Sequence, residues 1–295
     1  MNRASVLYVA EHKPDDCRRG ELLSRHTTFR VGGRADIFHA PGSIEGLVGA
    51  VELCRHLGLR SLVLGGGSNL LFSDRGFRGV ILSTRNLDAM TETSNGWRVE
   101  AGTPLSRVVS VAEARGTHAL SFLVGIPGTV GGAAVMNAGI RGTSIASVLE
   151  RVEILDRTGG VRTLTSAECG FRYRGSRMLE KGETVLAVHV RADGPAFDGR
   201  AMLARKQATQ PLSLPSAGCV FKNPEGHAAG ALIENSGLKG YRVGDAMISE
   251  KHANFIVNLG GASSAEICKL IDIVRQKVYN TFHVRLDLEI GVIDG

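Results

Sequence analysis

The sequence contains no CxxC pair, and its five cysteines are odd in number. They are widely spaced, at Cys17, Cys54, Cys169, Cys219 and Cys268. Disulfide-stabilised domains and zinc clusters need closely spaced or evenly numbered cysteines. The pattern therefore argues against both kinds of site, predicts no metal centre and favours a reducing compartment.

The sequence also lacks a signal segment and a membrane-spanning stretch. Residues 1–20 are polar and have no apolar core of the kind that secretory signals need. The longest uncharged stretch, residues 116–140, contains Pro127, Asn137 and several glycines, which do not suit a continuous apolar helix. We expect a cytoplasmic protein without membrane insertion, in which residues 116–140 form buried loop and ligand-contacting backbone.

Charge of one sign is not concentrated anywhere in the chain. The 35 Lys and Arg residues exceed the 29 Asp and Glu residues by a net +6, without a basic run. Nucleic-acid binding usually leaves a clustered basic patch, whereas a mild excess suits an anionic small molecule equally well. The sequence therefore gives no support for a nucleic-acid partner.

Glycine, in contrast, is abundant, with 38 residues and no collagen-like period. Residues 65–68 follow an expected strand, but the next segment is a strand signal and no Lys-Ser/Thr pair closes the loop, so neither a Rossmann fingerprint nor a P-loop is present. A second loop covers residues 125–133 and leads to residues 137–139. Consecutive glycines let backbone N–H groups converge on an anion. Tight turns remain the alternative, but two such loops favour a long diphosphate ligand, a dinucleotide rather than a mononucleotide.

Local capping signals predict several helices. Ser43 precedes a stripe of apolar residues with helical spacing, and Thr103 is followed by Pro104 at the first helical position. Thr165 with Glu168, and Ser263 with Glu266, match the capping-box pattern. We expect a helix after each of these residues.

Strands are expected between these helices. Residues 148–155 and 161–164 flank a turn at residues 156–160 and predict a hairpin. Residues 193–199 contain Gly194, Pro195 and Gly199 and are typical of a linker. The other expected strands are at residues 61–64, 79–82, 97–101, 184–190 and 285–290.

A series of motifs resembles one flavoenzyme family, the UDP-N-acetylenolpyruvoylglucosamine reductases. The resemblance extends from about Leu22 to Gly295, in the family's order, and each single motif would be weak alone. The motifs are residues 27–33 with Ala35 and Asp36, residues 65–69, 125–139, 173–176, 217–224, 249–258 and 286–290.

The resemblance implies an α+β protein with a two-lobed FAD-binding domain of the PCMH/vanillyl-alcohol-oxidase type and a C-terminal α/β substrate-binding domain. The implied layout is an N-terminal arm (1–20), a first FAD lobe (21–78), a second FAD lobe (79–193) and a substrate domain (200–295) whose last strand returns to the active site. No long insertion lies between Arg174 and Gly199. The chain therefore resembles the branch of the family that lacks a tyrosine-bearing loop.

The implied activity is the NADPH-driven reduction of the enolpyruvyl group of UDP-N-acetylglucosamine enolpyruvate to UDP-N-acetylmuramate, for peptidoglycan. FAD carries the hydride and the protein supplies position and charge. FAD would be bound non-covalently, because no histidine occurs between Gly58 and His118 to link it. NADPH rather than NADH is implied by the resemblance alone. The oligomeric state stays open, a monomer included.

Three residues match the family's catalytic positions. Arg174 has a guanidinium that suits a carboxylate. Glu289 is the C-terminal acid, and the sequence leaves open whether Asp287 shares its role. Cys219 matches the proton donor, for which many relatives have serine; a free thiol, with a pKa of about 8.5, is a competent acid near neutrality.

The resemblance also implies binding residues. Those for FAD are Arg30, Val31, Gly32, Gly65, Gly66, Gly67, Ser68, Asn69, Ile126, Gly128, Thr129, Gly131, Gly132, Ala133, Asn137 and Ala138. Those for the UDP-sugar are Arg205, Lys222, Asn223 and His252.

Two other hypotheses remain. The first is a related FAD-dependent oxidase or dehydrogenase that acts on another substrate. The second is a non-catalytic nucleotide-binding module, against which Arg174, Cys219 and Glu289 together argue.

Overall fold

The computed structural model describes residues 17–140 and 142–295, which form two compact units. The described part of unit 1 holds residues 17–19, 37–66 and 79–204, apart from residue 141; unit 2 holds residues 20–36, 67–78 and 205–295. Each unit is thus assembled from separated stretches of chain. Most of the expected N-terminal arm, residues 1–16, lies outside the described residues.

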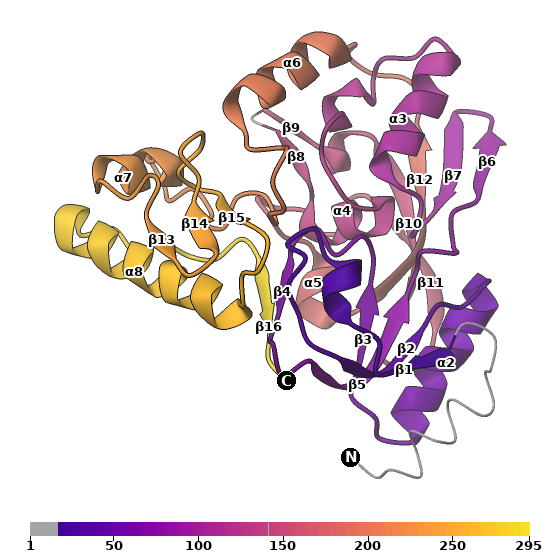
Figure 1. The fold of residues 1–295 in the computed structure, drawn as a ribbon. Coiled ribbons are helices and arrows are strands. Elements are labelled where there is room, and N and C mark those ends of the chain that lie inside the picture. Colours follow the sequence, from indigo (N-terminus) through magenta and orange to yellow (C-terminus); the bar gives the residue numbers. More distant parts are fainter. Residues whose placement is uncertain (1–16, 141) are drawn as a thin grey trace. The chain divides into compact units, whose positions relative to one another are not determined.

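Unit 1 contains a five-stranded antiparallel sheet in the order β11-β10-β12-β7-β6. Helices α3 and α4 pack against this sheet, and their apolar residues share one core with Trp97 and Val99 of β7 (Figure 1). The bounds are β6 Met90–Thr93, β7 Gly96–Glu100, β10 Leu149–Leu155, β11 Val161–Thr165, β12 Thr184–Arg191, α3 Leu105–Ala114 and α4 Val130–Met136.

A second sheet, in the order β1-β2-β5-β3, packs against helix α2 (Ile44–His56). Leu47, Ala50 and Cys54 lie on the buried face of this helix, and Ser43 caps it by accepting a hydrogen bond from the Gly46 N–H at 3.1 Å. The strands are β1 Cys17–Arg19, β2 Ala35–His39, β3 Ser61–Leu64 and β5 Phe77–Ser83. Strand β3 leads directly into the first glycine loop.

Unit 2 has its own core beneath a three-stranded antiparallel sheet, β13-β14-β15. Helix α8 packs against β13 and β14, and a parallel pair of strands joins β4 to β16. The bounds are η1 Leu23–His26, β4 Leu70–Phe72, α7 Ala229–Asn235, β13 Arg242–Val243, β14 Ala246–Ile248, β15 Ile256–Asn258, α8 Ser264–Phe282 and β16 Gly291–Ile293. The other elements of the described residues are η2 Ser121–Leu123, β8 Gly139–Ile140, β9 Thr143–Ser144, η3 Ile145–Ser147, α5 Arg177–Lys181 and α6 Gly199–Thr209.

Several expectations about local structure are confirmed. The helices after Ser43 and Ser263 are present, and Ser263 and Glu266 form the reciprocal capping box. The hairpin is present as β10 and β11. These elements depend on signals within a few residues, which the sequence displays directly.

Four other expectations are wrong. Residues 116–140 are not all loop, because α4 forms at Val130. Thr103 does not cap α3; Pro104 takes that position without a side-chain bond. Thr165 and Glu168 make the capping-box hydrogen bonds, but only a turn follows. The terminal strand is β16, whereas residues 285–290 contribute only an isolated bridge at Leu288.

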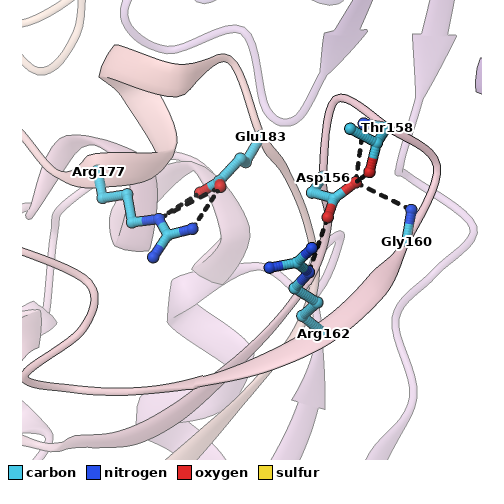
Figure 2. A network of polar contacts seen from close by, with 6 residues as sticks. All are labelled: Asp156, Thr158, Gly160, Arg162, Arg177 and Glu183. Carbon is cyan, nitrogen blue, oxygen red and sulfur yellow. Dashed lines mark hydrogen bonds and ion pairs between the residues drawn. The ribbon is translucent and has the colours of Figure 1, made fainter.

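The turn of the β10–β11 hairpin is built around the carboxylate of Asp156 (Figure 2). One carboxylate oxygen accepts hydrogen bonds from the Thr158 N–H, the Thr158 hydroxyl and the Gly160 N–H at 2.8, 2.6 and 2.9 Å. The other is 2.8 Å from Nε of Arg162. The hydrogen bond from the Thr158 side chain, followed by that from Gly160, lowers the pKa of Asp156 to about 2.

This depressed pKa predicts an acid-dependent contribution to stability. The unfolded-state pKa is near 3.8, so the stabilisation is fully present above that pH and is lost as pH falls through the folded-state value near 2. The difference in unfolding free energy between the wild-type protein and Asp156→Ala should therefore narrow between about pH 5 and about pH 2. Urea unfolding followed by circular dichroism measures it. Asp272→Ala, an exposed change on α8, is the control, and a difference that stays constant for Asp156→Ala would contradict the prediction.

Candidate active site

The two glycine loops meet within unit 1. A Cβ placed on Gly66 would lie 2.7 Å from Cα of Gly128, and one on Gly65 would lie 2.6 Å from Oγ1 of Thr129. Both separations are shorter than real Cβ contacts, and at Gly66 the neighbouring atom belongs to the backbone, so only glycine permits this approach without a backbone shift. The two loops are therefore in contact, and their joint binding of a diphosphate stays a prediction.

The first loop presents unused hydrogen-bond donors. Among the described residues, none accepts a hydrogen bond from the backbone N–H groups of Gly65, Gly66 and Gly67. Successive backbone donors without side chains are the usual environment for a phosphate group. This loop therefore fits the diphosphate of a dinucleotide such as FAD.

The second loop opens into α4. Thr129 caps this helix by accepting a hydrogen bond from Gly132, and the N–H of Gly131 donates to the carbonyl of Ala101 at 2.9 Å. Asn137 ends the helix with a left-handed backbone, at φ 46°. Its amide donates to the carbonyl of Arg172 and accepts from Ala146. Its polar atoms are thus engaged within the protein, and its role in FAD binding stays a prediction.

The motif at residues 27–33 lies in unit 2 beside Gly67, whose carbonyl accepts from the Thr28 N–H at 3.2 Å. Arg30 has a left-handed backbone with φ 56°, which is uncommon for a residue other than glycine and often marks functional sites. Within the described chain, the buried hydroxyls of Thr28 and Thr103 have no hydrogen-bond partner. Neither threonine was singled out for binding from the sequence, although Thr28 stands inside the motif.

Arg174 lies at the tip of a tight turn in unit 1. Arg172 and Gly175 exchange backbone hydrogen bonds at 3.0 and 3.1 Å on either side of it, and its own φ is 51°. Its guanidinium contacts the Gly139 carbonyl at 3.5 Å and lies 5.3 Å from the ring centre of Tyr173. In the sequence, only the family resemblance selects it over the neighbouring Arg172 and Arg177.

Those neighbouring arginines are committed to ion pairs. Arg172 pairs with Glu180 at 2.6 Å, and Arg177 pairs with Glu183 at 3.0 Å (Figure 2). Glu183 is buried, so movement of Arg177 away from it would leave an unpaired carboxylate in the protein interior. Arg172 and Arg177 thus each have a carboxylate partner in unit 1.

The segments that contain Cys219 and Glu289 lie side by side in unit 2. The N–H of Glu289 donates to the carbonyl of Val220 at 2.8 Å, and Phe221 forms a bridge with Leu288. The Val220 N–H donates to the carbonyl of Asn254 at 2.8 Å. The cysteine segment is therefore held between the 249–258 motif and the C-terminal motif.

The structure distinguishes the two acids of the C-terminal motif. Asp287 is exposed, whereas Glu289 is partly buried. The carbonyl of Asp287 accepts a hydrogen bond from the Lys222 N–H at 2.8 Å, so Lys222 also lies beside this segment. The burial favours Glu289 as the acid that faces a site.

The other expected substrate residues differ in their surroundings. Asn223 accepts a hydrogen bond from the N–H of Ala229, at the start of α7. His252 packs edge-on against Phe255 and accepts from the Asn254 N–H, and burial lowers the pKa of this histidine. Among the described residues, no hydrogen bond or ion pair connects the exposed Arg205 side chain to Cys219 or Glu289. All four assignments stay predictions.

No cluster of three or more metal-binding side chains occurs within residues 17–140 and 142–295. No helix in the described chain has both the length and the apolar character needed to cross a membrane.

Comparisons with known proteins identify both halves of the chain. Residues 35–165 match an FAD binding domain, and residues 210–293 match the UDP-N-acetylenolpyruvoylglucosamine reductase C-terminal domain. A UDP-N-acetylenolpyruvoylglucosamine reductase of Moorella thermoacetica is 44% identical over 276 residues, covering 92% of this chain and 91% of the relative. The enzyme of Clostridium novyi is 39% identical over 284 residues, covering 95% and 92%. The crystal structure of the Thermus caldophilus enzyme superposes with a TM-score of 0.79 at 37% identity, covering 94% of this chain and 99% of that one.

Proposed function

The chain belongs to the UDP-N-acetylenolpyruvoylglucosamine reductase family, and from this premise we propose that it reduces UDP-N-acetylglucosamine enolpyruvate to UDP-N-acetylmuramate with FAD and NADPH. The observation that carries the proposal is the match of both halves of the chain, in order, to the two domains of this family. The product serves peptidoglycan synthesis. The α+β fold, with its FAD-binding domain and reductase C-terminal domain, follows from the same match.

FAD supplies hydride transfer when it is bound. Gly65, Gly66 and Gly67 suit its diphosphate, because none of the described residues accepts a hydrogen bond from their N–H groups. We propose that the FAD-binding residues are those expected from the sequence, with the Thr28 hydroxyl added as a donor or acceptor. The lobes at residues 21–78 and 79–193, and the substrate domain at residues 200–295, remain our proposed division.

The chain's own residues supply position, charge and a proton. Reduction of the enolpyruvyl double bond builds negative charge beside the substrate carboxylate, and a guanidinium such as that of Arg174 stabilises such charge. The thiol of Cys219 gives its proton to the neighbouring carbon. Glu289 assists only when it is protonated or orients a donor, because a bare carboxylate would oppose the developing charge.

Lys222, Asn223, Arg205 and His252 are proposed to bind the UDP-sugar. The neutral form of His252 is favoured by its burial and by the Asn254 N–H that it accepts, so it would act as an N–H donor from the other ring nitrogen. The proposed site residues all come from one chain, which is compatible with action as a monomer. A cytoplasmic location is part of the same proposal.

The decisive experiment measures NADPH oxidation with UDP-N-acetylglucosamine enolpyruvate as the acceptor. We expect a yellow protein that releases FAD on denaturation and oxidises NADPH rapidly only when this acceptor is present. UDP-N-acetylglucosamine, which lacks the enolpyruvyl group, is the matched control and should not accelerate the reaction. Flavin reduction without acceleration by the enolpyruvyl substrate would favour a related FAD-dependent oxidase or dehydrogenase, and a protein that cannot bind FAD would exclude both.

A further inference from the structure

The backbone of Glu289 is held from two directions within unit 2. Its N–H donates to the carbonyl of Val220, next to Cys219, at 2.8 Å. Its carbonyl accepts a hydrogen bond from Nδ2 of Asn69 at 3.0 Å. Asn69 lies 220 positions away in the sequence, at the end of the first glycine loop. The backbone of Glu289 is therefore hydrogen-bonded to two of the motifs that carry the family resemblance, residues 217–224 and residues 65–69.

Asn69 makes a second bond to the same segment. Its own carbonyl accepts from the N–H of Gly291 at 2.9 Å, and the parallel pairing of β4 with β16 begins one residue later, with Leu70 opposite Gly291. One residue thus binds the chain on both sides of Ile290. The backbone bond to Gly291 does not need the Asn69 side chain, whereas the bond to the Glu289 carbonyl does.

The backbone of the loop that precedes Asn69 is itself constrained. Gly67, two residues earlier, has φ +60°, and a Cβ placed there would lie 2.0 Å from the carbonyl oxygen of His26. Its carbonyl also accepts from Thr28. The loop therefore has little freedom to shift. The hydrogen bond from the short amide side chain of Asn69 holds the Glu289 carbonyl at a fixed place relative to this loop.

We propose that Asn69 is a positioning residue for Glu289, which ties the placement of this acid to the first glycine loop. The proposal rests on the function proposed above and adds a second role to the expectation that Asn69 contacts FAD. Loss of the amide leaves the Glu289 carbonyl without this donor, so the segment can rotate and the carboxyl group moves. Displacements of about 1 Å at a catalytic group slow reactions by about 100-fold.

The test separates the two half-reactions in flavin-loaded protein by rapid mixing. In Asn69→Ala we expect transfer to the enolpyruvyl substrate to slow by about 10- to 100-fold in kcat with little change in KM, which is a larger loss than any slowing of flavin reduction by NADPH. Asn86→Ala is the matched control, because its amide donates to a distant carbonyl, that of Ala40, at 2.8 Å in unit 1. It should leave both half-reactions unchanged.

Two further measurements distinguish positioning from general damage. In Asn69→Asp the side chain donates to the Glu289 carbonyl only when it is protonated, so the rate of substrate reduction relative to wild type should rise as pH is lowered. Amide hydrogen exchange of residues 289–293 in the flavin-free protein should quicken in Asn69→Ala but not in Asn86→Ala.

A flavin-loaded Asn69→Ala protein with the wild-type kcat, or one in which both half-reactions slow equally, would overturn the proposal. Wild-type protein that takes electrons from NADPH but never reduces the enolpyruvyl substrate would instead overturn the proposed function. In that case unchanged exchange at residues 289–293 still refutes the positioning role, and quickened exchange still supports the contact.

Discussion

The Cys219→Ala variant is expected to accept reducing equivalents from NADPH like the wild-type protein and to lose turnover by about 10²- to 10⁴-fold, the usual contribution of general acid catalysis. The backbone at this position is held by the bridge between Cys219 and Phe255 and by the bond from Val220 to Asn254, neither of which needs the thiol. The variant therefore removes a proton donor and leaves the frame intact. Stopped-flow measurement of each half-reaction shows where the loss occurs.

Cys219→Ser is the matched variant, because a hydroxyl occupies this position in many relatives, and it should retain much of the activity. A thiol reagent should inactivate the wild-type protein but not Cys219→Ser. Burial raises the pKa of Cys54 and of Cys169 to about 11, so these thiols stay protonated and react slowly near neutrality. Normal turnover by Cys219→Ala would show that another group is the acid.

The parts of the fold that the sequence predicted are those set by neighbouring residues. Ser43 and Ser263 cap their helices, and the turn that begins at Asp156 closes its hairpin. Helix α4 was not predicted, because its first turn contains Gly131 and Gly132 and glycine has a low helix propensity. The N–H of Gly131 donates to the distant Ala101 carbonyl instead, so a tertiary contact determines the local structure.

The end of the chain shows the same limitation. Leu286, Leu288 and Ile290, within the residues 285–290 that we expected to form a strand, do pack into or against the core of unit 2. A strand, however, is defined by its partner, and the partner of this region is β4, more than 200 positions earlier, beginning opposite Gly291. Periodicity reveals burial but not pairing.

For the candidate site, the order of the motifs identified which segments matter, and the structure supplied how their residues are engaged. The resemblance selected Arg174, and the structure adds that Arg172 and Arg177 have carboxylate partners. The difference in exposure between Asp287 and Glu289, and the bond from Asn69 to Glu289, depend on contacts between distant segments. No pattern within one motif contains that information.

Gly66→Ala is expected to have the second large effect, by forcing the two glycine loops apart. The added Cβ would lie 2.7 Å from Cα and 3.3 Å from the carbonyl carbon of Gly128, and backbone atoms cannot rotate away as a flexible side chain could. Overpacking of this kind destabilises by about 1–3 kcal/mol. If the strain is greater in the FAD-bound protein than in the free protein, each difference of about 1.4 kcal/mol weakens FAD binding tenfold. Urea unfolding of the flavin-free protein and fluorescence titration with FAD measure the two effects separately.

At Gly66 the expected effect of an alanine comes from the clash with Gly128 and not from backbone strain. The φ of Gly66 lies outside the left-handed region, in which any side chain would be strained. Gly49→Ala is the matched control: Gly49 lies in α2, has no atom within 4 Å of its added Cβ, and should gain about 0.5–1 kcal/mol from the better helix former. The two variants make the same chemical change with opposite expected signs. If Gly66→Ala unfolded at the wild-type urea concentration and bound FAD with wild-type affinity, the contact between the two loops could not be what prepares this chain for a dinucleotide.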